Sequence, residues 1–439
     1  MSASALSAGV SPFRQAGSVV SVCGDVARVA GLDGAIGERC DFMRGAVIRA
    51  RGEVIGIDRG ELLVWVDEGA RGLDRRTLVL RRDGTASVAV SDAMLGRVLD
   101  GYGIPCDGGP SLATDGLDVR PLLAPPPGPM DRARIDTVFA TGIRAIDGLL
   151  TLGVGQRIGV FASAGVGKTT LLGMMARHCV AEVNVIALIG ERGREVREFV
   201  EDSLGPQGLA RSIVFCATAD APPTERHRCA YTAMAAAEHF RDRGSRVLLM
   251  LDSLTRFARA HREIGLAQGE MPTRRGFPSS LFSTLPRLLE RAGPGRDGSG
   301  SITAVATVLL EDRDLSDPIG EEVKSLLDGH VVLSPEVAAQ GVYPAIDVRE
   351  SISRLAARVG GEALNAAAVR IRFLLAKRDE VSPLVQLGEY RAGADPEADE
   401  ALERYPAIRR WLSQRVDEST PWADCEAGLC ALTERPSWT

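Results

Sequence analysis

The segment FASAGVGKTTLL, residues 161–172, carries glycines, a lysine and a threonine at a spacing that could hold phosphate groups. The usual phosphate-binding loop reads Gly, four residues, then Gly-Lys-Ser/Thr, and here Ala162 replaces the first glycine. Backbone N–H groups of such a loop converge on phosphates at the start of the next helix. Lys168 would neutralise the β and γ oxygens, and the Thr169 hydroxyl would ligate Mg²⁺. The predicted nucleotide-binding residues of the loop are Ser163, Ala164, Gly165, Val166, Gly167, Lys168, Thr169 and Thr170.

The sequence on both sides favours a working loop over a glycine turn in front of a packed helix. RIGVFA before it has the pattern of a buried strand, and KTTLLGMMARHCV after it has helical spacing of apolar residues. This strand, loop and helix context is what supports the motif. A simple glycine turn does not explain why a lysine follows it, and Ala162 is tolerable if its φ stays negative.

A second candidate is Asp252, at the end of the apolar run RVLLMLDS. Open α/β sheets place their ligands at the carboxyl ends of strands, where a carboxylate could hold Mg²⁺. Buried strands also end in aspartate when it caps a helix, but Ser253 and Thr255 compete for that role here. With the loop nearby, the sequence favours the metal role.

The segment VNVIALIGERGREVREFVE places Glu191 and Arg192 directly after another strand. Hydrolysis needs a base or orienting group for the attacking water, and a carboxylate at this strand end could supply it. Glu195 and Glu198 further on are expected to form solvated pairs with Arg194 and Arg197. Glu191 and Arg192 precede that helix and are the catalytic candidates, together with Lys168.

YPAIDVRESISR, residues 343–354, offers two more candidates. Tyr343 could present a flat face to adenine, or it could be an ordinary half-buried tyrosine. Arg354 is either a surface arginine or an arginine finger that stabilises transition-state charge, in that case in a neighbouring subunit's site.

The elements that must position these residues divide the chain into three parts. Short alternating runs punctuated by Gly and Asp predict a small β-barrel within residues 1–90. Apolar runs alternating with helical segments predict an α/β core with a mainly parallel sheet, residues 91–350. A proline-rich segment at 120–130 reads as a stiff crossing, and residues 351–439 have only helical periodicity.

Composition excludes several function classes. The 439 residues carry a net charge of −6, with 45% hydrophobic and 25% charged residues, which argues against a function that rests on a polybasic face. The eight cysteines form no CxxC pair or metal-binding spacing with the histidines, so free thiols in a reducing cytoplasm are expected. A secretion signal or membrane-spanning run is not evident, and a cytoplasmic protein is expected.

Taken together, the motifs resemble the ATPases of type III protein secretion, relatives of the rotary-ATPase catalytic subunits. The resemblance covers about residues 20–410, and within this family the loop commonly opens with alanine, as at Ala162. Pro344 to Ser353 matches the signature Pro, small, aliphatic, Asp, then Ser-x-Ser. The resemblance rests on LGRVLDGYGIPCDG, ASAGVGKT, IGERGREVREF, LLMLDSLTRFARA, GEMPTRRGFPSSLFSTLPRLLERAG, LLDGHVVLS and YPAIDVRESISR, in that order.

The resemblance implies a β-barrel, a RecA-like core and a helical carboxyl-terminal domain, assembled as a homohexamer with ATP and Mg²⁺ sites between subunits. It implies Glu191 as the catalytic carboxylate, Arg354 as a finger donated across the interface and Tyr343 against adenine. Because non-catalytic rotary subunits lack the carboxylate, this chain should hydrolyse ATP. Implied partners are stator and central-stalk proteins and chaperone–substrate complexes, with membrane contact only peripheral, at the inner face of the bacterial inner membrane.

An injectisome role is favoured over a flagellar one. The alternatives are a Rho-like hexameric nucleic-acid motor, opposed by the acidic balance and the scarcity of aromatics in the barrel, and a rotary ATP synthase subunit, opposed by the short tail. Departures from the family pattern are Met271, Phe277 and an acidic stretch at 311–317; none touches the chemistry.

Overall fold

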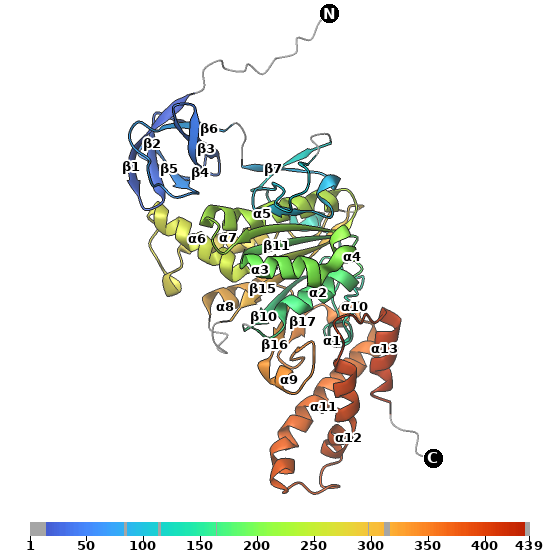
Figure 1. Cartoon of the computed structure of the whole chain (residues 1–439). Helices are drawn as coiled ribbons and strands as arrows, with labels where there is room; N and C mark the ends of the chain where they lie inside the picture. The colour runs from blue at the N-terminus through green and yellow to red at the C-terminus, as the bar shows by residue number, and fades with distance from the viewer. Residues whose placement is uncertain are drawn as a thin grey trace, which may run out of the picture.

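The computed structural model of the chain describes residues 15–82, 86–112, 116–163, 165–296, 298–310 and 317–434. Three parts follow one another (Figure 1): a β-barrel, a central sheet covered by helices, and a group of helices near the carboxyl end. This arrangement confirms the fold class expected from the sequence. None of the helices within the described ranges has both the length and the apolar character needed to cross a bilayer.

The barrel has a core of its own. Successive side chains of a strand point to opposite sides, so each strand sends alternate residues inward. Phe42, Val54 and Val64 are among the inward side chains and are fully buried. The barrel closes in the strand order β1 (Ala16–Cys23), β2 (Val26–Ala30), β5 (Glu61–Val66), β4 (Val47–Asp58), β3 (Arg39–Arg44) and β6 (Leu78–Arg81).

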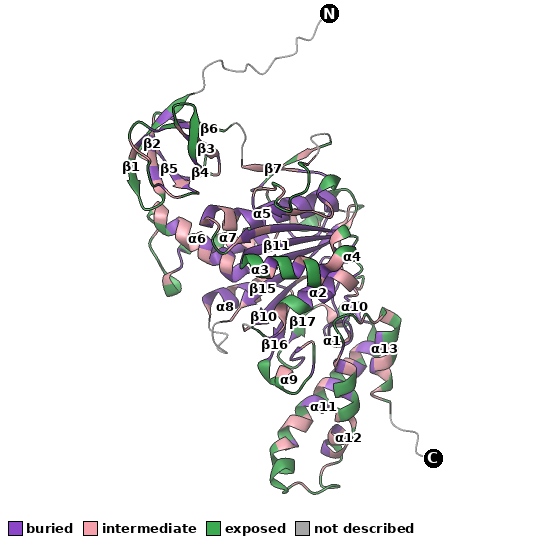
Figure 2. Ribbon diagram, in the orientation of Figure 1, coloured by how far each residue is buried: buried purple, intermediate pink, exposed green. Residues whose placement is uncertain are grey.

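The central sheet is parallel except at β14 (Gly293–Pro294) and β17 (Ile352–Ser353), and its middle strands are buried along nearly their whole length (Figure 2). Such strands read as continuous apolar runs because both faces are covered. The strand order is β17, β16 (Gly329–Leu333), β10 (Arg157–Ala162), β15 (Ser301–Leu309), β13 (Arg246–Asp252), β11 (Val183–Glu191), β12 (Ser212–Thr218) and β8 (Val98–Asp100). β17 and the short β14 pair antiparallel with β16 and β15.

Helices pack on both faces of this sheet, as the sequence predicted. One apolar core contains side chains of α5 (Pro223–Asp242), α6 (Leu254–Gln268), α7 (Ser279–Leu289) and α8 (Pro318–Leu326). The core on the opposite face contains side chains of α1 (Arg144–Leu149), α2 (Lys168–His178), α3 (Gly193–Glu198), the π-helical turn η3 (Phe199–Leu204) and α11 (Glu362–Leu387). Shorter elements are η1 (Asp92–Met94), η2 (Pro129–Asp131), α4 (Gly205–Ala210), η4 (Arg274–Gly276), α9 (Pro335–Ala339) and α10 (Ala356–Val359).

The carboxyl-terminal helices α11, α12 (Pro396–Leu412) and α13 (Trp422–Ala431) are fastened to the start of the core through Arg144. Its guanidinium donates to the carbonyl oxygens of Trp411 and Ser413, both at 2.7 Å. The side chain of Gln414 returns a hydrogen bond to the Gly142 carbonyl, also at 2.7 Å. These contacts connect the start of the core, at residues 142–144, to the end of α12, at residues 411–414.

The limits of the three parts remain a prediction. The two-stranded ribbon of β7 (Ser87–Val90) and β9 (Asp118–Pro121) lies between the barrel and the core, and the following prolines, residues 125–127, lie outside helices and strands. At the other limit, β17 pairs with β16 of the core sheet beyond residue 350. The boundaries at residues 90 and 350 are therefore proposed ones, since elements near both limits contact the neighbouring part.

The barrel meets the core through largely buried polar side chains, here called the junction cluster: Arg39, Glu53, Asp67, Tyr102 and Arg228. Arg39 bonds Asp67 at 2.7 Å and the Tyr102 hydroxyl at 2.6 Å, and Arg228 bonds Glu53 at 3.3 Å. Both guanidiniums lie over the Tyr102 ring, 4.1 and 5.3 Å from its centroid. Burial raises the pKa of Glu53 to about 7, outweighing the two arginines, which lower it.

Candidate functional site

The glycine loop lies between the end of β10 and the start of α2. Gly165 and Gly167 have φ of 82° and 96°, in the left-handed region that glycine adopts without strain, and Gly167 is the N-cap of α2. Gly165, Thr169 and Thr170 are exposed, Ser163 is partly buried, and Val166 is buried. The loop therefore presents a helix N-terminus to solvent, a geometry suited to phosphate. The predicted Ala164 lies outside the described residues.

Lys168, Glu191 and Asp252 converge at the carboxyl ends of β10, β11 and β13. The Lys168 ammonium lies 3.2 Å from Glu191 Oε1 and also bonds Asp252 Oδ1. Glu191 is 8% and Asp252 2% exposed, and the Lys168 side chain 11%. The structure thus brings together three residues that the sequence predicted separately.

Burial and ion pairing act in opposite directions on the pKa of Lys168 and on the pKa of Glu191. Burial raises the pKa of Glu191 above its ordinary value, and nearby Asp252 adds to that rise, against the lowering effect of Lys168. Burial lowers the pKa of Lys168, but the carboxylates, Asp252 foremost, outweigh it and hold that pKa above its usual range. Lys168 is therefore charged, and Glu191 has the raised basicity that suits a proton acceptor.

Two residues that were not predicted from the sequence hold the carboxylates of Glu191 and Asp252 in place. Arg256, in the first turn of α6, donates to Glu191 Oε2 at 3.2 Å and also bonds the Gly190 carbonyl. Gly190 has φ 68°, and a Cβ there would lie 2.9 Å from Arg256 Cδ, so glycine admits the arginine. Thr307, fully buried in β15, donates to Asp252 Oδ1 at 2.6 Å. We call Lys168, Glu191, Asp252, Arg256 and Thr307 the loop-edge cluster.

The signals for the missed residues were present but weak. Arg256 follows Asp252 by four residues, one helical turn, and Thr307 is a hydroxyl in the apolar run SITAVATVLL. Ser253 is the N-cap of α6, accepting from the Arg256 backbone N–H at 3.4 Å. Asp252 is thus not the capping residue, the alternative left open by the sequence.

Arg192, the other predicted catalytic residue of this segment, lies outside the cluster. Its side chain is 76% exposed and pairs with Glu195 at 3.2 Å at the start of α3. The next pairs along the helix are Arg194 with Glu198 at 3.6 Å and Arg197 with Glu201 at 2.8 Å. The charged face of α3 is solvated and Arg194 pairs with Glu198 as expected, but Glu195 pairs with Arg192 rather than with Arg194 or Arg197.

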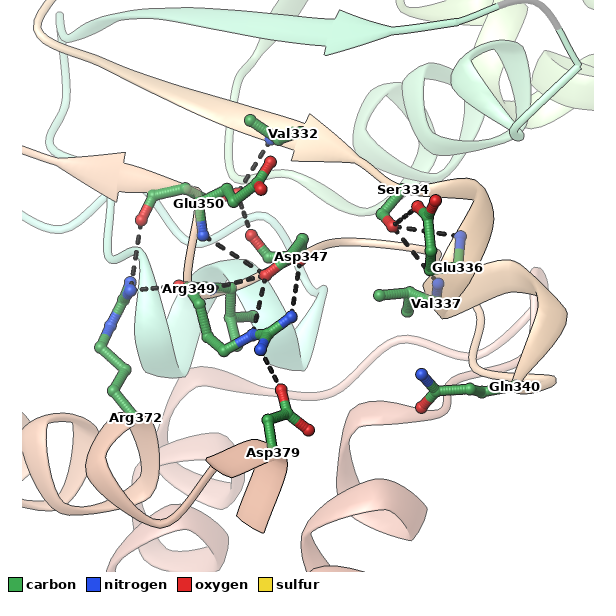
Figure 3. Close-up of polar contacts among 12 residues, drawn as sticks. Val332, Ser334, Glu336, Val337, Gln340, Asp347, Arg349, Glu350, Arg372 and Asp379 are labelled. Carbon is green, nitrogen blue, oxygen red and sulfur yellow. Dashed lines mark hydrogen bonds and ion pairs between the residues drawn. The ribbon is translucent and has the colours of Figure 1, made fainter. Parts of the chain in front are cut away.

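The signature segment that contains Tyr343 is fixed by its own polar residues (Figure 3). Asp347 Oδ1 accepts from the backbone N–H groups of Arg349 and Glu350, at 2.9 and 3.3 Å. The Ser351 hydroxyl donates to the Asp347 carbonyl at 2.5 Å and accepts from Val332 N–H of β16 at 2.9 Å. Asp347 and Ser351 of the signature therefore tie the segment to the sheet.

Figure 3 also shows the neighbouring cap of α9 and the helical contacts below the segment. Ser334 accepts from the N–H groups of Glu336 and Val337, at 3.2 and 3.4 Å. Arg349 pairs with Asp379 of α11, and Arg372 of α11 donates to the Ser351 carbonyl at 3.2 Å. The carboxyl-terminal helices thus hold the segment from the other side.

Tyr343 and Arg354 lie at opposite ends of the sheet. Leu333 of β16 pairs with Ala162, at the glycine-loop end, and bridges to Ile346 near Tyr343, which is 53% exposed. Ser353, just before Arg354, pairs with Gly329 at the other end of β16. Four strand residues separate these ends, about 13 Å, more than an arginine side chain spans. Arg354 is exposed and lies next to the end of β16 that is far from the loop of its own chain.

The donors at the loop suit a hard cation such as Mg²⁺, which prefers oxygen ligands and retains water when bound to phosphates. The exposed Thr169 hydroxyl, at the start of α2, and the Asp252 carboxylate, at the end of β13, supply two oxygen groups at the same edge of the sheet. Within the described ranges, no group of three His, Cys, Asp or Glu side chains could hold a metal by itself. A cation here would therefore depend on phosphate oxygens as well.

Two of the residues in which the sequence departs from the family pattern, Met271 and Phe277, lie between α6 and α7. Met271 is 82% exposed between α6 and α7, and Phe277 is buried with the Arg262 guanidinium 5.1 Å from its ring centroid. Residues 311–316 of the acidic stretch lie outside the described residues, and Asp317 caps α8.

Comparison with known proteins identifies relatives over nearly the whole chain. The nucleotide-binding domain of the ATP synthase alpha/beta family matches residues 142–353, and the T3SS EscN ATPase C-terminal domain matches 362–431. The chain is 53% identical to the type 3 secretion system ATPase of Xanthomonas euvesicatoria, over 96% of this chain and 95% of that protein. It is 44% identical to the flagellum-specific ATP synthase of Treponema pallidum, over 96% and 94%.

Solved structures agree. The assembled ATPase EscN of the enteropathogenic E. coli type III secretion system has a TM-score of 0.88 and 42% identity, over 95% of this chain and 99% of that one. EscN in complex with its central stalk EscO has a TM-score of 0.86, 41% identity and the same coverage.

Proposed function

This chain belongs to the family of type III secretion and flagellum-specific ATPases and is an ATP hydrolase, and we propose that it hydrolyses Mg-ATP to energise protein export. The observation that carries the catalytic proposal is the meeting of Lys168, Glu191 and Asp252 beside an exposed glycine loop. Each of these groups has a distinct task at a triphosphate.

In this proposal Lys168 turns from the two carboxylates to the β and γ oxygens, drawn by their greater negative charge. Glu191, held by Arg256, orients the attacking water and accepts its proton. Asp252 and Thr169 would hold Mg²⁺, which neutralises charge on the phosphates when bound. Arg192 precedes α3 at the Glu191 strand end and would reach the phosphates only after leaving Glu195.

Arg354 is proposed to complete a neighbour's site. Because it lies at the far end of β16 from the loop of its own chain, it can serve as a finger only in another subunit. The relative EscN is an assembled ATPase, and we propose a homohexamer for this chain, with Tyr343 against the adenine.

We further propose that the hexamer releases and unfolds chaperone-bound substrates at an injectisome, held by stator and central-stalk proteins at the cytoplasmic face of the inner membrane. The EscN complex with its stalk EscO supports a stalk partner. Relatives of both injectisome and flagellar name match, so this assignment needs its own test. A Rho-like motor is disfavoured by the net charge of −6, which gives no broad counterion-release term for RNA.

Glu191→Gln tests the hydrolytic assignment. We expect ATP affinity to be retained and turnover to fall by roughly 10²–10⁴-fold, the usual contribution of a general base. Glu198→Gln, an exposed carboxylate on the adjacent helix α3, is the matched control and should keep full turnover. Near-normal hydrolysis by Glu191→Gln would exclude its catalytic role, and strong stimulation of the wild type by RNA would favour the nucleic-acid motor.

A chromosomal Glu191→Gln strain separates the two export systems. Loss of effector secretion with intact motility is expected for an injectisome ATPase. Loss of motility with intact effector secretion would assign the chain to the flagellum instead.

Mixing Arg354→Ala chains with Glu191→Gln chains tests the intersubunit finger. Each variant alone should be inactive, but some junctions of a mixed ring pair an intact Glu191 site with an intact Arg354 from the neighbour. Those junctions should recover part of the ATPase rate. If differentially tagged mixed rings show no activity above either parent, the finger does not act across the interface or one dead site stops the ring. Arg354→Lys keeps the charge without the planar fork and should rescue poorly.

A further inference from the structure

Two cysteines that are far apart in the sequence meet at the edge of the central sheet. All eight cysteines are free, as expected from the sequence. Cys106 and Cys216, however, are separated by 110 positions along the chain, and their sulfur atoms lie 3.6 Å apart. This contact joins two thiols that sequence spacing gave no reason to pair.

The turn that follows β8 brings the two thiols together. Cys216 lies in β12 and pairs with Asp100 of β8. After Asp100 the chain folds back, so that the Cys106 backbone N–H donates to the Val98 carbonyl at 3.0 Å. Cys106 is exposed and Cys216 partly buried. A small reagent can therefore reach Cys106 first, with Cys216 positioned behind it.

The immediate surroundings favour Cys106 as the attacking sulfur. The hydrogen bond shared with Cys216 lowers the pKa of Cys106, although burial and nearby Asp100 and Asp107 oppose this. The same hydrogen bond, together with burial, raises the pKa of Cys216. Thiolate, rather than thiol, is the nucleophile in disulfide exchange, so the first step belongs to Cys106.

We propose that Cys106 and Cys216 are a reversible oxidation site that forms an intramolecular disulfide by exchange with a small-molecule disulfide such as oxidised glutathione. The Cys106 thiolate attacks one sulfur of the reagent, forming a mixed disulfide and releasing one equivalent of reduced thiolate. Cys216, after loss of its proton to solvent, attacks the Cys106 sulfur and expels the second equivalent. Two protein thiols are oxidised and one reagent disulfide is reduced to two thiols; excess thiol reverses both steps.

The motion required is small and falls on a partly exposed turn. A disulfide has an S–S distance of about 2.05 Å, so the sulfur atoms must approach by roughly 1.5 Å. The turn also contacts two other parts of the molecule: Gly101 bonds Glu225 and Thr232 of α5, at 3.3 and 2.8 Å, and Tyr102 accepts from Arg39 of the barrel. The bond would therefore fix a turn at which sheet edge, α5 and barrel meet.

The test uses the full-length protein in a glutathione redox buffer, with free thiols alkylated before peptide mass spectrometry under non-reducing conditions. In the wild type we expect a linked Cys106–Cys216 peptide, reversed by dithiothreitol, with little glutathione retained at Cys106. In Cys216→Ser the resolving thiol is absent, so glutathione should remain on Cys106. Cys23, exposed on β1, is an internal control that should retain glutathione in both proteins.

The outcomes separate a paired site from two ordinary thiols. Equal retention of glutathione at Cys106 in the wild type and in Cys216→Ser would overturn the proposal, as would absence of the linked peptide while Cys23 is modified. Cys106→Ser gives a second measurement that does not depend on the folding of Cys216→Ser, and its Cys216 should stay unmodified. Oxidation should raise the thermal midpoint of the wild type only, because a cross-link that closes a long loop restricts the unfolded chain. A lower thermal midpoint of the oxidised wild type would show that the disulfide does not fit the folded structure and would contradict the proposal. None of these readouts depends on ATP hydrolysis.

Discussion

The loop-edge cluster and the junction cluster contain the same balance of charge, two basic and two acidic side chains each, yet we assign only one of them a chemical role. In both clusters every carboxylate pairs with at least one cation, and burial raises the pKa of one glutamate. The pairs are Lys168 and Arg256 with Glu191 and Asp252 at the loop edge, and Arg39 and Arg228 with Glu53 and Asp67 at the junction.

The difference lies in what surrounds the charges. At the junction the Tyr102 ring lies against both guanidiniums, and the charged side chains pair with one another between the barrel and α5. At the loop edge the exposed Gly165 and Thr169 and the start of α2 lie next to Lys168, so a triphosphate can approach and exchange partners with it. A buried charge cluster therefore indicates a function only where a binding surface adjoins it.

Lys168→Ala and Arg228→Ala should separate the two clusters most clearly. Lys168→Ala removes the cation that faces phosphate, and we expect turnover to fall to background and nucleotide affinity to drop. It also leaves the buried Glu191 and Asp252 without this cation, so stability should fall in this variant as well. Arg228→Ala leaves the largely buried Glu53 without its ion-pair partner, a change that typically costs about 3–5 kcal/mol of stability, while turnover per folded chain should stay near normal. ATPase rate, nucleotide titration and thermal unfolding measure both variants. Loss of turnover in folded Arg228→Ala would mean that the junction is coupled to catalysis.

The positions of Lys168, Asp252 and Glu191 could be predicted because each follows an apolar strand, and the carboxyl ends of parallel strands meet at one edge. Thr307 could not, because its role depends on β15 lying between β10 and β13, and the order of strands is not written in any local pattern. Arg192, by contrast, was predicted to lie at the site, and the structure places its side chain outside the loop-edge cluster. It adjoins Glu191 in sequence, but its side chain points to solvent and pairs with Glu195.

Thr307→Val should have an intermediate effect at the loop edge. It keeps the shape of the side chain but removes the hydroxyl that donates to Asp252 at 2.6 Å. Hydrogen bonds to charged groups contribute about 1.5–3 kcal/mol, so the Mg²⁺ concentration that gives half-maximal ATPase rate should rise roughly ten- to a hundredfold. Thr307→Ser restores the hydroxyl and should rescue most of the loss.

Thr303→Val is the matched control for that measurement. Thr303 is fully buried in the same strand, but its hydroxyl accepts from the Gly155 N–H at 2.8 Å, away from the loop. Its replacement should lower stability without moving the Mg²⁺ dependence. If Thr303→Val and Thr307→Val shift that dependence equally, Thr307 acts only through the packing of β15.

The smallest expected effect belongs to the junction, where Glu53→Gln should change how stability depends on pH. Burial raises the folded-state pKa of Glu53 to about 7, above the value of about 4.3 for an unfolded glutamate. Between these values the folded chain keeps a proton that the unfolded chain has lost, so Glu53 makes stability decrease as pH rises through this window, with the loss complete above pH 7. Glutamine stays neutral throughout, so the thermal midpoint of Glu53→Gln relative to the wild type should increase from pH 5 to pH 8, by about 1–3 °C. Glu403→Gln removes one charge from the exposed surface of α12 and controls for net charge. A constant difference between Glu53→Gln and the wild type at every pH would show that Glu53 is ionised throughout, and the two clusters would then differ in their electrostatics as well as in their surroundings.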